Sequence, residues 1–458
     1  MLRALAAAAG LPAIGAAGAP RRVVGIVGAG MAGVALAWLL DGARDVVLLE
    51  ARDEVGGNVR SLPVELDGHG FAVDIGAQYF HPGPYPLYTA LLRHLGLYPP
   101  DPAGSHAFTA SITVADASEP TPRFVSPVLP ERAWPLTAPW NRAGVQAFAV
   151  AFTAARKRER QREDWTVTLE EWLPTLGLSS AQWEGMLLPW AASLFSGSVE
   201  QARGLSARAA MVFAAKALPI NPLAPIVYYT LVPGMAEPLR RMLGESSTVD
   251  VQTGAAVEHL SRAAAGGWTV RCADGRDFAV DDLVLASSGP AALLLLGDVP
   301  GTDARRAALA GIEFHEARLA LHTDPLYAPA DPSHRSFLNC AIDGGHCEAS
   351  MWLAGLLPAA PPATAARVWK SWVTHRPPPA EVLHEAEFRH MLPTRATLRA
   401  QAAARLLQGR DGIWLAGGYL HPYDSQESAL RSALGVALGL GVGSGRVAAL
   451  RGAGIQLD

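Results

Sequence analysis

The sequence predicts an α/β protein of two domains, one of which is assembled from separated stretches of the chain. A short apolar strand, a glycine-rich turn and an apolar helix follow one another between residues 22 and 40. Helical patterns dominate from about 85 to 224, and strand patterns return at 225, so the first domain is interrupted and then resumed. With 458 residues, half of them hydrophobic, the chain can bury two separate cores.

These patterns define the expected domain boundaries. A terminal extension comes first, at 1–21. The strand-rich domain is expected to be discontinuous and to comprise 22–84, 225–310 and 407–458. A second, helix-rich α+β domain, suited to binding a substrate, is expected from 85–224 and 311–406.

Composition narrows the classes of ligand. The net charge of −4 gives no basic bias, so nucleic acid is not expected as a partner and a small molecule is. The three cysteines are too few and too irregularly spaced for a disulfide framework or a zinc site, and we expect them to be reduced, with no metal bound.

The first twenty residues are small and apolar, with Arg3 near the start. They are consistent with a signal or transit segment, or with a plain extension. No later run has the roughly 18 uninterrupted apolar residues that a membrane span needs. We therefore expect a soluble protein with no transmembrane segment, cytoplasmic or organellar, with secretion as the alternative.

The strongest motif is the glycine turn after the first strand. Gly28, Gly30 and Gly33 fit the G-x-G-x-x-G pattern between a strand and a helix, and Met31 and Ala32 begin that helix. The glycines allow a tight turn, close approach of a pyrophosphate and close helix packing. Glu50 ends the second strand, where a carboxylate can bind ribose hydroxyls. The unit predicts a Rossmann-like dinucleotide-binding domain.

A second glycine pair soon after Glu50 favours FAD over NAD, because a longer ligand needs another close backbone segment. Here the sequence resembles the flavin-containing amine oxidase superfamily, whose members commonly carry a Glu-Ala-Arg, Gly-Gly and Asp-x-Gly-Ala signature. The resemblance implies cofactor-binding roles for Glu50, Ala51, Arg52, Gly56, Gly57, Asn58, Val59, Gly76, Ala77, Gln78 and Tyr79. Asn58 stands where an arginine is usual, so the flavin phosphate contact is expected only if Arg60 takes it over.

The resemblance extends to the later segments of the same domain, where it implies cofactor contacts from Val257, Gly417, Gly418, Gln426, Glu427 and Ser428. Many relatives have an acidic residue at the position of Gly418. Asp424 and Glu427 have capping-box spacing, which predicts a helix N-terminus there. No cysteine or histidine lies in a recognisable tether motif, so FAD is expected to be noncovalent. Three segments, 350–354, 373–378 and 406–419, resemble a branch of the superfamily associated with cyclopropane fatty acid synthases. The segment 76–80 resembles renalase-like enzymes.

The expected catalytic residues are His421, Tyr419 and Tyr79. His421 and Tyr419 lie in the loop between the last strand and the last helix, and an unperturbed histidine titrates near neutrality. His81 is a further candidate. The alternative is that the aromatic residues pack against the flavin edge and Asp424 caps the helix. The superfamily's usual lysine is not found in a matching segment, which disfavours amine oxidation.

We therefore expect an FAD-dependent oxidoreductase that transfers a hydride between flavin N5 and an apolar organic substrate at a C–N or C–C centre. Oxygen or another acceptor would take up the electrons. Two alternatives remain open: a catalytically weak FAD-binding partner of another enzyme, and a flavin-dependent isomerase.

Overall fold

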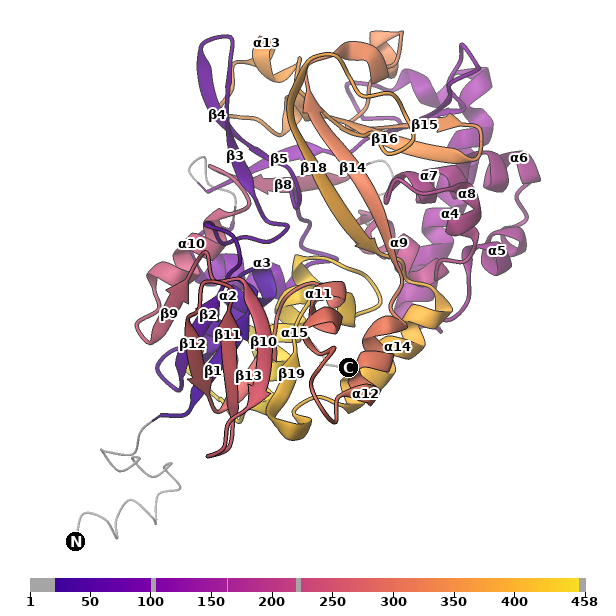
Figure 1. Ribbon diagram of the computed structural model, residues 1–458. Coiled ribbons are helices and arrows are strands. Elements are labelled where there is room, and N and C mark those ends of the chain that lie inside the picture. The colour runs from indigo at the N-terminus through magenta and orange to yellow at the C-terminus, as the bar shows by residue number, and fades with distance from the viewer. Residues whose placement is uncertain (1–20, 100–103, 163, 220–223, 453–458) are drawn as a thin grey trace, which may run out of the picture.

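The computed structural model describes residues 21–99, 104–162, 164–219 and 224–452. The extension expected at the N-terminus lies almost entirely outside the described residues. Figure 1 shows two halves, a lower one around a parallel sheet and an upper one around a larger, mainly antiparallel sheet.

The lower half is centred on a five-stranded sheet in which every neighbouring pair is parallel. Its strands come from the start, the middle and the end of the chain. In spatial order they are β19 (Ile413–Leu415), β13 (Asp282–Leu285), β1 (Val23–Val27), β2 (Asp45–Leu49) and β9 (Val249–Gln252). Strands from three separated stretches of the chain therefore share one sheet.

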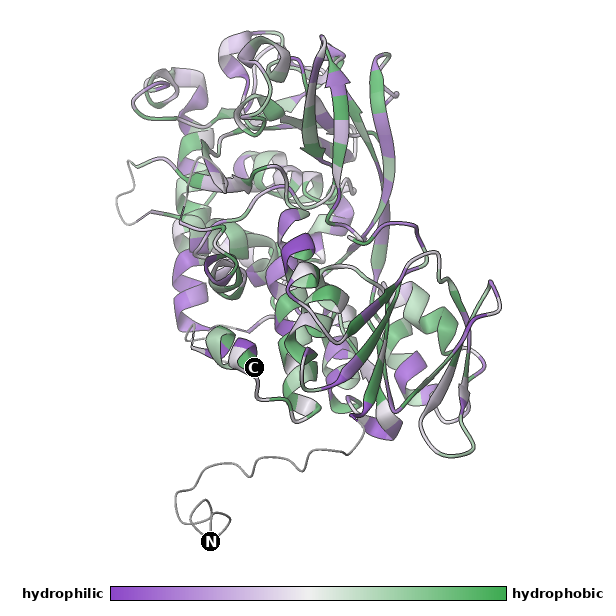
Figure 2. Cartoon of the chain, turned by 90° about the vertical axis from the view of Figure 1, so that its left-hand side faces the viewer, coloured by the Kyte–Doolittle hydropathy of each residue, from purple (hydrophilic) through white to green (hydrophobic). Residues whose placement is uncertain are grey.

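Helix α2 (Met31–Leu40) follows the glycine turn and is buried along its whole length. It packs against β2 and against α15 (Gln426–Gly439), which explains why it is apolar on every side. Three further helices complete this layer: α3 (Pro86–His94), α10 (Glu237–Gly244) and α16 (Gly445–Arg451). In Figure 2 hydrophobic residues run along the strands and inner helices of this half.

A three-stranded antiparallel sheet lies beside the parallel one. It consists of β10 (Val257–Arg262), β11 (Trp268–Cys272) and β12 (Asp277–Val280). Three helices follow: α11 (Gly289–Leu295), α12 (Asp303–Ala310) and α14 (Arg395–Leu406). The side chain of Trp268 is fully buried in the core that these elements share.

The upper half contains a seven-stranded sheet. Its strands, in spatial order, are β18 (Val382–Met391), β14 (Phe314–His322), β17 (Trp369–Trp372), β16 (His346–Trp352), β15 (Leu338–Asp343), β6 (Ile112–Asp116) and β7 (Phe124–Val125). The long strands β14 and β18 extend down to the parallel-sheet half (Figure 1). They carry the sheet to the region between the halves.

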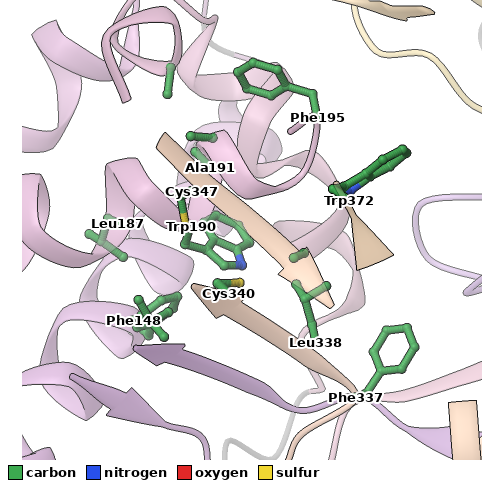
Figure 3. Close-up of a cluster of buried hydrophobic side chains, with 14 of the residues drawn as sticks. Phe148, Leu187, Trp190, Ala191, Phe195, Phe337, Leu338, Cys340, Cys347 and Trp372 are labelled. Carbon is green, nitrogen blue, oxygen red and sulfur yellow. The ribbon is translucent and has the colours of Figure 1, made fainter. Parts of the chain in front are cut away.

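Helices from the middle of the chain lie beside this sheet, and α4 and α7 contact its strands. They are α4 (Arg142–Gln161), α5 (Leu169–Trp172), α6 (Ser180–Gln182), α7 (Leu188–Ser193), α8 (Val199–Arg203) and α9 (Ala207–Ala217), with α13 (Pro362–Ala365) elsewhere in this half. Figure 3 shows Trp190 of α7 packed over Cys340 and Cys347 of the two central strands. All three cysteines are buried and free, as expected.

One strand pairs differently from the sequence expectation. We expected residues 226–231 to reopen the first domain, but β8 (Val227–Leu231) pairs with β5 (Ser105–Thr109) from the helix-rich segment. The preceding hairpin, β3 (Ser61–Leu66) and β4 (His69–Asp74), is also separate from the central sheet. Strands β5 and β8 lie between the halves, whereas the hairpin extends along the side of the upper half (Figure 1).

Candidate functional site

The glycine turn forms the floor of the candidate site. Gly30 makes an isolated parallel bridge with Gly56, so the two glycine-rich segments lie against each other. A Cβ on Gly57 would lie 3.0 Å from the Gly30 Cα, and the Gly57 φ of +58° is left-handed. No side chain caps α2, so its N-terminal N–H groups remain available to an anion.

Glu50 ties this turn to two further segments. Its carboxylate accepts hydrogen bonds from the Ala29 N–H at 2.9 Å and the Arg52 N–H at 3.1 Å. Its backbone N–H donates to the Gln252 carbonyl, and its carbonyl accepts from the Ala255 N–H. The segment leading to Val257 is therefore held beside the carboxylate.

The Gly76–Ala77 turn rests on the second glycine segment. The Ala77 N–H donates to the Asn58 carbonyl at 3.0 Å. A Cβ on Gly76 would lie 2.0 Å from the same oxygen, so only glycine fits. Val59, one residue on, is 3 % exposed and fixes this segment in the core.

Two arginines bring positive charge to these turns. Arg52 donates to the Gly57 carbonyl and pairs with Glu50. Arg60 is half-buried, and within the described ranges its guanidinium has neither a hydrogen bond nor an ion pair. Burial, followed by the charge of Arg52, lowers the pKa of Arg60. A half-buried cation without a hydrogen bond or ion pair, beside backbone turns, fits an anionic ligand.

The last strand and helix border the same region. A turn containing Gly417 and Gly418 follows β19, and α15 begins at Gln426, so a helix N-terminus is present as expected. The N-cap is Ser425, however, whose hydroxyl accepts from the Ser428 N–H at 3.2 Å. The expected pairing of Asp424 with Glu427 is wrong, because the Glu427 carboxylate accepts from the Tyr88 N–H of α3 instead.

Asp424 fills the space beside Gly418. A Cβ on Gly418 would lie 1.9 Å from the Asp424 Oδ1, so this carboxyl occupies the place that a side chain at 418 would take. Asp424 is accessible to solvent, but the protein atoms packed around its carboxyl group raise the pKa of this group to about 6.

The two candidate tyrosines lie in apolar surroundings. Tyr79 contacts the rings of Phe108, Tyr228 and Phe337 edge to face, with centroids 5.1–6.0 Å apart. Burial raises the pKa of Tyr79 to about 12 and that of Tyr419 further. The Tyr419 hydroxyl is buried and has no partner in the described part of the chain. Both tyrosines are therefore protonated at neutral pH.

The histidines do not titrate where the sequence analysis expected. Burial, followed by the charges of Arg431 and Arg405, lowers the pKa of His421 to about 3. Burial lowers the pKa of His81 to about 4. Both imidazoles are neutral near pH 7, so the expected ionisation of His421 near neutrality is wrong.

Lys370 is the residue that sequence reasoning missed. It lies on β17 and is 2 % exposed, and its Nζ donates to the carbonyls of Asp74, Ile75 and Gly76 at 3.2, 3.3 and 3.3 Å. The lysine thus binds the turn that carries Gly76. The available signal was a lysine in a short segment bounded by two tryptophans, Trp369 and Trp372.

Burial and the charge of Asp74 shift the pKa of this lysine in opposite directions. Burial lowers the pKa of Lys370 to about 7, against the opposing charge of Asp74. The three carbonyl bonds require all three protons of the ammonium group. Because every donor of Lys370 is then occupied, its ammonium group holds the turn in place.

The residues brought together fit a dinucleotide: glycine turns without room for side chains, an uncapped helix N-terminus, a half-buried cation without a partner and a buried hydroxyl without a partner. The ring of Tyr79, which follows the Gly76–Ala77 turn, packs on Tyr228. These features and the family of the chain identify an FAD-dependent oxidoreductase. The sequence profile of flavin containing amine oxidoreductases matches residues 31–317, well over half of the chain. The chain belongs to this family, and its cofactor is FAD, bound noncovalently.

Solved structures share the fold at low identity. A CLA-producing fatty acid isomerase from P. acnes aligns with a TM-score of 0.63 and 14 % identity, over 92 % of this chain and 98 % of that one. Wild-type putrescine oxidase bound to putrescine aligns with a TM-score of 0.61 and 17 % identity, over 92 % and 98 %. No curated protein matches the chain. No helix among the described residues is long and apolar enough to cross a membrane.

Proposed function

We propose that this protein transfers a hydride between FAD and an apolar organic substrate, at a C–N or C–C centre. The observation that carries the proposal is the group of aromatic side chains around Tyr79, formed with Phe108, Tyr228 and Phe337. It adjoins the turn at Gly76 and offers a reacting molecule apolar walls.

The parallel sheet serves, in this proposal, as a Rossmann-like domain for the adenine end of the cofactor. The backbones of Gly30 and Gly57 would meet the pyrophosphate, and Glu50 the ribose hydroxyls. The free guanidinium of Arg60 would replace the arginine missing at Asn58. Asp424, which fills the space at Gly418, would supply the carboxyl that relatives carry at that position.

FAD, when bound, accepts or returns a hydride at N5. The residues of the chain contribute positioning and exclusion of water. In an oxidation the substrate loses one hydrogen as hydride and one as a proton released to solvent, and the two electrons pass on to oxygen or another acceptor. His421 and His81 are neutral near pH 7 and poorly basic, which supports hydride transfer controlled by orientation.

An isomerase is the second candidate, because a structure described as a fatty acid isomerase has the same fold. In that case the cofactor would end each cycle in its starting oxidation state.

One experiment tests both candidates. The purified holoenzyme is mixed anaerobically with amines, isoprenoids and fatty acyl compounds, and flavin bleaching and product mass are recorded. Lasting bleaching with a product two hydrogens lighter supports the oxidoreductase. A product of unchanged mass without lasting bleaching supports the isomerase. If no apolar compound yields either result while charged, polar ones bleach the flavin, the proposed substrate class is wrong.

A further inference from the structure

A cavity of about 230 Å³ lies between the β3–β4 hairpin, the end of β8 and the segment from Leu353 to Ala359. Figure 1 shows the hairpin beside β5 and β8, on the outer side of the region between the halves. Its walls are mainly apolar and include Phe71, Val73, Leu231, Leu356 and Leu357. Such walls favour a ligand that buries apolar surface.

Gln78 supplies a polar group to this cavity. The residue is 5 % exposed, and one end of its amide lies against the Met351 Sδ. Because a thioether only accepts hydrogen bonds, this end is the nitrogen. The amide oxygen, Oε1, is buried and has no hydrogen-bond partner among the described residues. An unpaired buried acceptor is costly, and a ligand carrying an N–H or O–H would satisfy it.

The nearby Asp74 carboxyl is already satisfied. It accepts hydrogen bonds from the Ser61 hydroxyl at 2.5 Å and from the Met235 N–H at 3.0 Å. Among the described side chains that line the cavity, the Gln78 oxygen is the buried acceptor without a partner.

The cavity adjoins the aromatic group of the proposed substrate site. Gln78 is followed by Tyr79, whose ring packs on Tyr228. Thr230, which lines the cavity, lies two residues beyond Tyr228 and so on the same face of β8. Along the other wall, a Cβ on Gly355 would lie 3.5 Å from the Phe108 Cβ. The cavity thus borders the aromatic group around Tyr79.

We propose that the cavity is the entrance compartment of the substrate site and binds an apolar chain with a single hydroxyl or amino group, whose hydrogen is donated to the Gln78 Oε1. This assignment rests on the proposed function and names its substrate class. In this assignment the Gln78 side chain selects the substrate, while the backbone of the Gly76–Tyr79 segment contacts the cofactor.

The test is calorimetric titration of the FAD-loaded full chain with 1-octanol and with its isomer dibutyl ether, which has no donor. Wild type should bind octanol more tightly than the ether. Gln78→Leu should lower octanol affinity about three- to tenfold, to that of the ether, because one hydrogen bond is lost. Ala359→Trp, at the exposed mouth, should lower the affinity for both probes at least about tenfold, since an indole there blocks entry.

Ala363→Trp is the matched control, because Ala363 is equally exposed but lies on α13 outside the cavity. It should bind both probes as wild type does. Should Ala359→Trp fail to fold, Ala72→Phe narrows the same cavity from the hairpin. The assignment is overturned if wild type does not bind octanol, if the blocking variant matches Ala363→Trp, or if Gln78→Leu keeps its preference for octanol.

FAD content and flavin reduction are measured separately on each variant. If octanol binding follows the variants as expected while no compound in the panel reacts, the cavity assignment stands and the proposed reaction fails. If compounds of the panel react but all variants bind octanol equally well, the proposed reaction stands and the cavity assignment fails.

Discussion

His421 lies in the loop between the last strand and the last helix, where the sequence pattern predicted it. Its protonation state could not be predicted in the same way. Arg405 on α14 and Arg431 on α15 approach it only in the folded chain, and together with burial they lower its pKa to about 3. A sequence position can be identified from motifs, whereas a pKa depends on neighbours brought together by packing.

We expect His421→Gln to leave the rate of flavin reduction per bound FAD within about threefold of wild type, far from the 10²–10⁴-fold worth of a positioned base. The pH profile of reduction should also be unchanged, because the native imidazole is neutral above pH about 3. Stopped-flow reduction across pH checks this. Loss of an ionisation near neutrality would contradict it.

The same variant should change acid stability in a defined direction. The unfolded imidazole takes up a proton near pH 6.5, whereas the folded one does so only near 3. The unfolded state therefore binds more protons between these values, and this residue makes the free energy of unfolding fall as pH decreases through that window. His421→Gln should lose less Tm than wild type between about pH 7.5 and about pH 5. Thermal melting at both values measures the difference.

Arg60 is proposed to bind a phosphate of FAD, because Asn58 stands where members of the family usually have an arginine. We expect Arg60→Gln to raise the Kd for FAD roughly ten- to a hundredfold, since a charge-assisted hydrogen bond to phosphate would be lost. Fluorescence titration of the apoprotein with FAD measures it. Arg160→Gln removes the same charge from the exposed side of α4 and is the control. Equal affinities in the two variants would rule out the phosphate contact.

At the scale of elements, strands with turns at both ends were predicted well. The expected strand before the glycine turn and the expected strand that Glu50 ends correspond to β1 and β2. The partner of β8 was not predictable, because the pattern of side chains along a strand indicates that it is half-buried but not which strand it pairs with. Its pairing with β5 joins segments more than a hundred residues apart.

Two substitutions in the glycine motif at the start of α2 can distinguish an effect on cofactor binding from an effect on folding. A Cβ on Gly30 would have no neighbour closer than the Gly57 Cα at 3.7 Å, whereas a Cβ on Gly33 would lie 1.9 Å from the Gly28 carbonyl oxygen. Gly30→Val should therefore give a folded apoprotein with normal circular dichroism and little or no FAD. Gly33→Ala should destabilise the fold itself, by about 1–3 kcal/mol or more.

Urea unfolding of both apoproteins, together with their flavin content, distinguishes these effects. Full flavin occupancy in Gly30→Val would show that this turn does not approach the cofactor.

At the scale of the whole molecule, Lys370 links the two halves. Its strand belongs to the upper sheet, while the three carbonyls that it binds lead into the Gly76–Ala77 turn, which packs on Asn58. No sequence pattern predicted this contact, because it joins residues almost three hundred positions apart. The interrupted parallel-sheet domain was predictable, since its segments carry their own motifs.

We expect Lys370→Met to reduce the free energy of unfolding by about 1–3 kcal/mol, because buried carbonyls lose their donor, and to lower FAD occupancy through the released turn. Urea denaturation and flavin absorbance measure the two effects. Lys157→Met, an exposed lysine on α4, should change neither. If both variants retained wild-type stability and flavin content, Lys370 would not hold the turn.

The burial of α2 against α15 has a consequence for protein synthesis. In the nascent chain α2 emerges early, yet the helix that covers it begins almost four hundred residues later. At about 5–20 residues per second, a ribosome needs roughly 20–80 s to make the intervening chain. During that time an apolar helix surface is without its native cover and is a target for chaperones. We therefore expect the flavin to be captured only after translation has passed residue 439.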